Sequence, residues 1–249
     1  MLHRDDRDGL AVLRFDHDKV HALDLDLLRA LRDQLEQLEV SPARALVLTG
    51  TGSAFSAGVD LQRVLTEGDD YVRAFLPELS RALEALFEFP RPVVAAVNGH
   101  AIAGGLVLAA ACDRRIATDN EKARLGLTEL KVGVPFPVAA LEVMRFLLPT
   151  HVVQDLVYTG RLVDTEEALS IGLVDERVAN DEVLDRALAV ADRLAAIPAK
   201  TFAATKDHLR QPTVDTIGTL KINLEDSIRR LWTDDTTEAA VRNFLASLG

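Results

Sequence analysis

Residues 95–134 have the sequence AAVNGHAIAGGLVLAAACDRRIATDNEKARLGLTELKVGV, and the rest of the chain is organised around this stretch. A β-branched apolar run at 93–97 meets an Asn-Gly turn, and the Ala-Gly-Gly sequence at 103–105 then opens an apolar helix over 106–112. A strand that ends in a turn and leads into a glycine-rich helix start leaves backbone N–H groups directed at one point. Such a point suits an anion, either a phosphate or the oxyanion of an activated carbonyl.

A second small-residue loop has the same position relative to a strand. The segment SAFSAGVD at 53–60 follows the fully apolar strand predicted at 45–49. Each loop could supply one N–H to a shared oxygen, and each donor of such an oxyanion hole contributes roughly 3 kcal/mol. Phe55 occupies the third glycine position of a dinucleotide fingerprint, and neither a P-loop nor a G-x-S-x-G elbow is present. The loops therefore predict a site for an oxyanion.

The composition limits the class of protein and its partners. The chain has 249 residues, 48 % of them hydrophobic, which is typical of a globular protein with a sizeable core. Its net charge of −11 disfavours nucleic acid and anionic membranes as partners. Cys112 is the single cysteine, so no internal disulfide is possible and a reducing compartment is indicated. The acidic N-terminus lacks the apolar segment of a signal peptide, and we expect a cytoplasmic protein.

The spacing of apolar residues predicts an α/β core followed by a helical region. Strands are expected at 10–15 and 45–49, and leucines at helical spacing predict an amphipathic helix that begins near Leu27. The apolar run 93–112 contains polar residues and three glycines, which favours a buried strand–turn–helix over a membrane span. Long helical patterns dominate towards the C-terminus. The predicted division is an α/β core over 1–195 and a helical region over 196–249.

Four ordered motifs carry a resemblance to a known family. They are SAFSAGVDL, VNGHAIAGGLVLAAACDRRIAT, LGLTELKVGV and GLVDERV, and together they span most of the chain. This set resembles the crotonase (enoyl-CoA hydratase/isomerase) superfamily in order and spacing. The resemblance implies an α/β fold, a crotonase (ClpP-like) spiral of ββα units with a C-terminal helical trimerisation region. It also implies an acyl-CoA site in the core and oligomerisation through residues 196–249.

The resemblance assigns roles residue by residue. It implies that the backbone amides of Val59 and Gly104 form the oxyanion hole for the thioester carbonyl, and that Glu129 is the catalytic acid–base residue. It implies that backbone and neighbouring groups bind the coenzyme A moiety. The residues implied in substrate and coenzyme A binding are Ala22, Leu23, Ser56, Ala57, Val59, Asp60, Leu61 and Gly104.

The acids present decide which reaction is expected. Hydratases of this family use two glutamates, and the position of the first is Val107 here, whereas the second matches Glu129. Because a positioned acid or base contributes roughly 100- to 10,000-fold, hydration is disfavoured. One base suffices to move a double bond from a 3-enoyl to a 2-enoyl thioester. In this respect the chain is most similar to the mitochondrial-type Δ3,Δ2-enoyl-CoA isomerases, and apolar neighbours are expected to raise the pKa of Glu129.

Three alternatives stay open at this point. They are an enoyl-CoA hydratase, another enolate chemistry such as acyl-CoA hydrolysis or decarboxylation, and a non-catalytic acyl-CoA-binding protein. The expected isomerase needs no metal and no separate cofactor, since coenzyme A arrives as part of the acyl-CoA thioester substrate. The resemblance implies a homotrimer or a dimer of trimers, and no nucleic-acid or membrane partner is expected.

Several other polar and aromatic side chains are candidates for lesser roles. His17 and His21 lie near the predicted coenzyme A edge but lack the spacing of a metal site. Asp113 and the two arginines that follow it are expected to end the helix and pair locally. We expect Phe244 to pack in an oligomer, although closure over the acyl-CoA is also open. Nothing in the sequence selects Lys206 over other lysines for contact with the coenzyme A phosphates.

Overall fold

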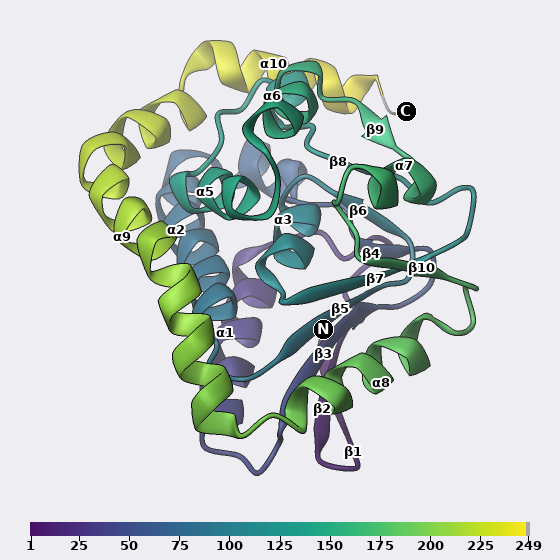
Figure 1. Cartoon of the computed structure of the whole chain (residues 1–249). Helices are drawn as coiled ribbons and strands as arrows, with labels where there is room; N and C mark the ends of the chain where they lie inside the picture. Colours follow the sequence, from purple (N-terminus) through teal and green to yellow (C-terminus); the bar gives the residue numbers. More distant parts are fainter. Residues whose placement is uncertain (248–249) are drawn as a thin grey trace.

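Two sheets form the framework of the protein, whose computed structural model describes residues 1–247 (Figure 1). The larger sheet has the order β1-β2-β3-β5-β7-β10 and is parallel except for the antiparallel pair β1–β2. The smaller sheet has the order β4-β6-β8-β9 and is parallel except for the pair β8–β9. The strands are β1 (Leu2–Arg7), β2 (Leu10–Phe15), β3 (Ala45–Gly50), β4 (Ala54–Ser56), β5 (Val93–Val97), β6 (His100–Ile102), β7 (Arg114–Thr118), β8 (Leu125–Gly126), β9 (Leu162–Val163) and β10 (Glu176–Val178).

The chain winds through these sheets in repeated ββα turns. The orders β3-β4-α2, β5-β6-α3 and β7-β8-α4 each contribute one strand to the large sheet, one to the small sheet and then a helix. This confirms the predicted spiral. The helices are α1 (Leu25–Glu39), α2 (Leu61–Glu88), α3 (Gly104–Ala111), α4 (Glu129–Val132), α5 (Val138–Leu147), α6 (Thr150–Thr159), α7 (Thr165–Ser170), α8 (Val183–Ala195), α9 (Ala199–Trp232) and α10 (Asp235–Ala246).

Both faces of the large sheet are buried, which explains its continuous apolar strands. In β3, Leu46 and Leu48 face the main core, whereas Ala45 and Val47 face α8. Because alternate side chains of a strand point to opposite faces, a strand covered on both faces buries all of its side chains, and its sequence is mainly apolar. The run ALVLT was predicted as a strand on this ground, and the structure confirms it.

Most predicted elements are present, with two differences. The helix expected to begin near Leu27 is α1, which Asp24 caps by accepting a hydrogen bond from the Leu27 N–H at 2.8 Å. The strand–turn–helix expected over 93–112 is β5, β6 and α3. The leucine spacing at 79–87 indicates a helix, which the structure shows to be only the end of the longer α2. The strand β1 was not predicted because its sequence, LHRDDR, is almost entirely polar.

The C-terminal helices return to the core and pack against it. Helix α9 runs along α2 and α5, and α10 crosses to α2 and α4 (Figure 1). The break between α8 and α9 lies at the predicted boundary, and the division into a core over 1–195 and an oligomerisation region over 196–249 stays a prediction. Among residues 1–247, no helix combines the length and apolar content needed to cross a bilayer.

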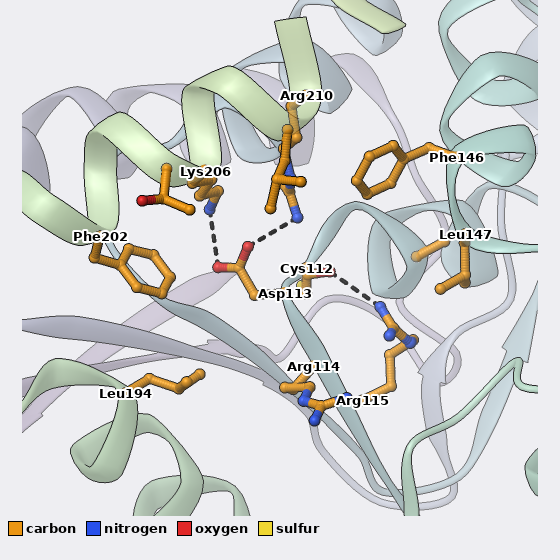
Figure 2. A pocket seen from close by; sticks show the side chains of 13 residues that line it. Cys112, Asp113, Arg114, Arg115, Phe146, Leu147, Leu194, Phe202, Lys206 and Arg210 are labelled. Carbon is orange, nitrogen blue, oxygen red and sulfur yellow. Dashed lines mark hydrogen bonds and ion pairs between the residues drawn. The ribbon is translucent and has the colours of Figure 1, made fainter. Parts of the chain in front are cut away.

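A buried ionic cluster joins α9 to the start of β7. Asp113 accepts hydrogen bonds from Lys206 at 2.9 Å and from Arg210 at 2.8 Å, as Figure 2 shows. Arg210 also lies over the Phe87 ring, 4.2 Å from its centroid. The expectation that Asp113 pairs locally was wrong, because its cationic partners come from a helix that is distant in sequence. Lys206 is 6 % exposed, and its ammonium group is paired with Asp113.

Candidate active site

The two predicted donor loops lie against each other. Leu23 and Val59 form a parallel bridge, in which the Leu23 N–H donates to Gly58 O at 2.7 Å and the Asp60 N–H donates to Leu23 O at 3.0 Å. The second loop contacts the first at Gly105, where a β-carbon would lie 2.2 Å from Ser56 O. Only glycine permits so close an approach of the two backbones.

The amides of Val59 and Gly104 remain free beside this contact. Gly104 is the first residue of α3, where helix geometry provides no acceptor for the N–H. Among residues 1–247, neither amide donates a hydrogen bond to a protein acceptor. Ala103, which precedes Gly104, has φ 50° and ψ −126°, a backbone conformation that costs about 1–3 kcal/mol for a residue other than glycine. Residues with backbone strain of this size cluster at functional sites, where the surrounding structure holds the backbone in one conformation.

A cavity of about 340 Å³ opens next to these amides. Its walls come from the two loops, from α2, α4 and α5, and from the C-terminal helices. The lining is predominantly apolar, and Glu129 is its only carboxylate among the described residues. The residues that line it are Ala57, Val59, Leu61, Leu79, Leu83, Ile102, Ala103, Gly104, Thr128, Glu129, Lys131, Val132, Val134, Pro137, Ala140, Leu162, Trp232 and Phe244. The structure therefore brings Glu129 to the same cavity as both predicted donors.

Glu129 is buried without the partners that a buried carboxylate normally has. The residue is 7 % exposed, and its Oε2 atom has no hydrogen-bond partner in the protein. Burial disfavours the charged form and raises the pKa of Glu129 to about 8, while its own backbone N–H lowers the pKa to a smaller extent. An acid with a pKa near neutrality can both accept and return a proton at physiological pH.

Val107 is the residue that the resemblance aligns with the first glutamate of the hydratases, and this assignment stays a prediction. It lies one turn into α3, is fully buried, and is not among the residues that line the cavity. Lys131 is the other ionisable side chain at the cavity. No second carboxylate in the described part of the chain, residues 1–247, lines it.

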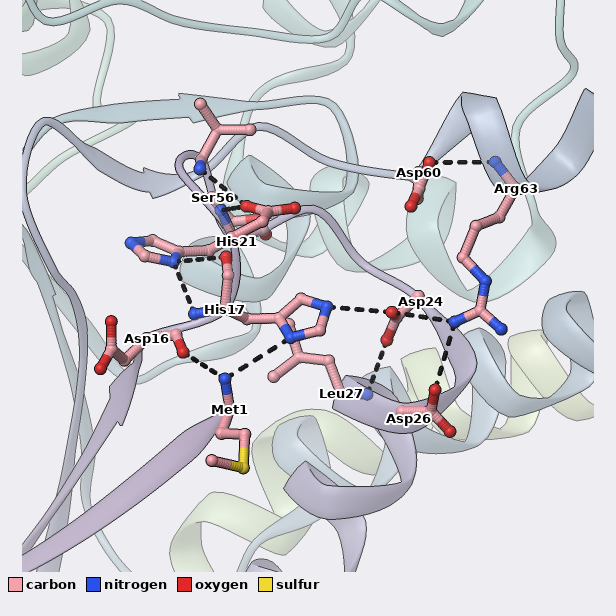
Figure 3. Close-up of polar contacts among 12 residues, drawn as sticks. Met1, Asp16, His17, His21, Asp24, Asp26, Leu27, Ser56, Asp60 and Arg63 are labelled. Atoms are coloured by element: carbon pink, nitrogen blue, oxygen red, sulfur yellow. Dashed lines mark hydrogen bonds and ion pairs between the residues drawn. The ribbon is translucent and has the colours of Figure 1, made fainter.

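The segments predicted to bind coenzyme A are held together by a polar network (Figure 3). The Ser56 hydroxyl donates to His21 O at 2.7 Å, and the Ala57 N–H donates to Val20 O at 2.9 Å. These bonds place Ala22 and Leu23 beside Ser56 and Ala57, as a shared coenzyme A edge requires. Their role in binding stays a prediction.

Neighbouring charged side chains in this network have structural tasks. Asp60 caps α2 by accepting from the Arg63 N–H at 3.0 Å, whereas Leu61 lines the cavity. His17 Nε2 lies 2.9 Å from Asp24 (Figure 3), and His21 contacts the backbone of Thr51. No group of side chains suited to hold a metal ion occurs within residues 1–247.

Two cavity residues come from the C-terminal helices. Trp232, which the sequence did not single out, ends α9 within the charged sequence RRLWTDD, where no pattern points to a ligand site. Phe244 of α10, for which packing in an oligomer was expected and closure over the acyl-CoA was also open, lines the cavity of its own chain. Both lie more than a hundred residues after Glu129 in the printed sequence, and only the return of the C-terminal helices brings them to the cavity.

Comparison with known proteins places this geometry in a family. The enoyl-CoA hydratase/isomerase family profile matches residues 5–241. A putative enoyl-CoA hydratase from Thermus thermophilus is 37 % identical over 198 residues, which cover 78 % of this chain and 77 % of the relative.

Two solved structures are similar in fold over almost the whole chain. Human mitochondrial Δ3-Δ2-enoyl-CoA isomerase has a TM-score of 0.95 at 26 % identity, covering 99 % of this chain and 97 % of the human one. A probable enoyl-CoA hydratase from Mycobacterium tuberculosis has a TM-score of 0.85 at 29 % identity, covering 92 % and 97 %. The chain therefore belongs to the enoyl-CoA hydratase/isomerase family of the crotonase superfamily, whose members act on acyl-CoA thioesters.

Proposed function

We propose that this protein is an enoyl-CoA isomerase that converts a 3-enoyl-CoA into the conjugated 2-enoyl-CoA. The Glu129 carboxylate removes a proton from Cα, and the electron pair of that C–H bond moves towards the thioester carbonyl. The amides of Val59 and Gly104 donate to the resulting oxyanion of the dienolate. The protonated Glu129 then returns its proton to Cγ, so the double bond moves and no other reactant is consumed.

One observation carries this proposal: among residues 1–247, Glu129 is the single carboxylate that lines the cavity. Hydration needs one group to activate water and a second to handle the α-carbon proton, and Val107 cannot do the former. A positioned acid or base is worth roughly 100- to 10,000-fold in rate. A double-bond shift uses the same carboxylate twice, so one acid is sufficient.

The electrostatics of the cavity support the same reaction. A raised pKa makes the Glu129 carboxylate a stronger base towards a weakly acidic C–H bond. The apolar walls exclude water, which strengthens the interaction of the two amides with a developing oxyanion. Val59 and Gly104 contribute backbone amides only, so the donors do not depend on side-chain chemistry at these positions.

The rest of the proposed assembly follows from the family resemblance. Coenzyme A would bind along Ala22-Leu23 and Ser56-Ala57 as part of the substrate, with no separate cofactor. We propose a homotrimer or dimer of trimers in the cytoplasm, with the C-terminal helices at the subunit contacts.

A weak hydratase is the second candidate, favoured by the description of the Thermus relative as a putative enoyl-CoA hydratase. The two activities separate in one absorbance experiment. Purified protein is mixed with a 3-enoyl-CoA in one cuvette and a 2-enoyl-CoA in another, and the band of the conjugated thioester is followed in both.

A rise in the first cuvette with little change in the second is the expected result. Loss of the band in the second would overturn the proposal in favour of hydration by a group other than Val107. No absorbance change in either cuvette, with acyl-CoA binding still measurable, would favour a non-catalytic binder or another enolate chemistry. Release of free thiol would then identify hydrolysis, and release of carbon dioxide would identify decarboxylation.

A further inference from the structure

The segment that carries Glu129 has little regular structure of its own. Helix α4 is a single turn, and the chain then runs without helix or strand until α5 begins at Val138. An isolated turn of helix is not stable by itself, because its few hydrogen bonds do not offset the cost of helix nucleation. Contacts with other elements must therefore set where the Glu129 carboxylate lies.

One such contact is a hydrogen bond from the C-terminal region. The Trp232 indole N–H donates to the carbonyl oxygen of Pro135 at 2.9 Å. Trp232 is 4 % exposed, and its ring forms part of the wall of the cavity that holds Glu129. The same side chain thus shapes the cavity and fixes the backbone six residues after the acid.

A second contact closes the other end of the same turn. Gly133, which ends α4, has φ 101°, and a β-carbon there would lie 2.5 Å from the Ala240 β-carbon. Helix α10 therefore packs directly against the turn that carries Glu129, at a distance that only glycine at position 133 allows. Gly133 also donates its N–H to Glu129 O at 3.0 Å.

Both contacts come from the C-terminal arm, which we define as residues 232–246. Phe244 of the same arm also lines the cavity. The arm belongs to the same chain as Glu129, so this chain itself supplies the cavity wall formed by Trp232 and Phe244. The remaining ionisable group at the cavity, Lys131, makes no ion pair among the described residues, and it does not contribute to the raised pKa of Glu129.

We propose that Trp232 is a positioning residue for Glu129: its hydrogen bond to Pro135, together with the Gly133–Ala240 contact, holds the turn in place and keeps water from the carboxylate. This inference rests on the proposed function for the role of Glu129 as the proton shuttle. The C-terminal arm is thus part of the catalytic apparatus as well as a packing region.

Replacing Trp232 by phenylalanine separates positioning from packing. The Trp232→Phe variant keeps an aromatic ring in the wall but loses the indole N–H. The turn should then loosen and water should reach Glu129, so the pKa of this carboxyl should fall from about 8 towards its ordinary value. We expect kcat to fall by about 10- to 100-fold with a smaller change in KM, because misplacement of a catalytic group costs rate more than binding.

The decisive readout does not require turnover. Protein labelled with ¹³C at the glutamate side-chain carboxyls is titrated by NMR, and the Glu129 resonance is identified by its loss in the Glu129→Gln variant. A lower titration midpoint in Trp232→Phe supports the proposal. An unchanged midpoint overturns it. A Tyr71→Phe variant, which alters a buried aromatic of α2 that does not line the cavity, is the matched control and should leave the midpoint unchanged.

A second pair of variants tests the other contact and guards against misfolding of the first. Gly133→Ala should push α10 from the turn and lower the Glu129 midpoint in the same direction. Adding Ala240→Gly removes the methyl group that the new β-carbon meets, and should restore part of the shift. Failure of the double variant to recover any of it would contradict the role of this contact. Because the midpoints are measured without substrate, they test positioning even if the wild-type protein shows no isomerase activity, a result that would overturn the proposed function alone.

Discussion

Two carboxylates in this protein, the partly buried Asp113 and the buried Glu129, have opposite surroundings. Asp113 lies between β5, β7 and α9, where Lys206 and Arg210 donate to its two oxygens and the Val93 N–H donates at 2.7 Å (Figure 2). Glu129 lies among apolar side chains, and one of its oxygens has no partner. The first carboxylate joins two parts of the fold, whereas the second is kept at the edge of a cavity.

The difference shows how burial of a charge can serve stability or chemistry. A buried acid that is fully paired fixes the groups around it, and removing it leaves their charges without compensation. A buried acid without partners costs stability, and such groups persist mainly at functional sites. The predictions below test whether the Asp113 cluster and the Glu129 cavity divide their roles in this way.

The largest expected effect is on the rate of isomerisation. Replacing Glu129 by glutamine removes the base but keeps the shape and polarity of the side chain. The rate of conjugated product formation should fall by roughly 100- to 10,000-fold, as expected for loss of a positioned acid–base group. Affinity for an acyl-CoA, measured by calorimetry, should change little. A variant with nearly full activity would show that another group moves the proton.

The Asp113 cluster should respond to mutation through stability. The Asp113→Ala variant leaves Lys206 and Arg210 buried without a counter-charge, and should lower the free energy of unfolding by about 3–5 kcal/mol. Denaturant unfolding measures this change. Activity per folded molecule should stay near that of the wild type. Loss of activity without loss of stability would contradict the proposed division of roles between the two regions.

The stability of the protein should depend on pH through Glu129. The pKa of Glu129 is about 8 in the folded protein and near 4.5 when unfolded. Between these values the folded state holds a proton that the unfolded state has lost, so the contribution of this group to stability is complete below about pH 4.5 and is lost as pH rises through about 8.

The Glu129→Gln variant does not titrate and provides the reference for that effect. The stability of the wild type relative to this variant should fall by a few kcal/mol between about pH 5 and about pH 9. Denaturant melts of both proteins across this range measure the difference. Parallel curves for the two proteins would mean that Glu129 is ionised in the folded state throughout.

The smallest effect is expected at Cys112, which borders the Asp113 cluster. Burial raises the pKa of its thiol to about 12, and the thiol donates to Leu108 O at 3.4 Å. A thiol reagent that needs the thiolate should therefore modify it only on unfolding. Mass spectrometry after incubation of the native protein should show no adduct. Rapid modification would indicate that the cluster opens far more readily than its pairing implies.

The sequence predicted those features that depend on local pattern and motif. Periodic leucines located α1, the apolar run ALVLT located β3, and the glycines before α3 marked a close backbone approach. The family motifs predicted the spiral fold, which the structure confirms. The polar strand β1 escaped prediction because it lies at a sheet edge and buries little of its surface.

Glu129 shows what the sequence by itself determined: the acid, its apolar neighbours and the valine at position 107 are all contained in a short stretch of chain. Partners distant in sequence were decided only by the tertiary structure. Asp113 was expected to pair locally, yet its cations come from α9, and Trp232 reaches the Glu129 turn only because the C-terminal helices fold back. Such contacts depend on how whole helices pack against the core. Short sequence patterns predict the helices but not which surfaces they pack against.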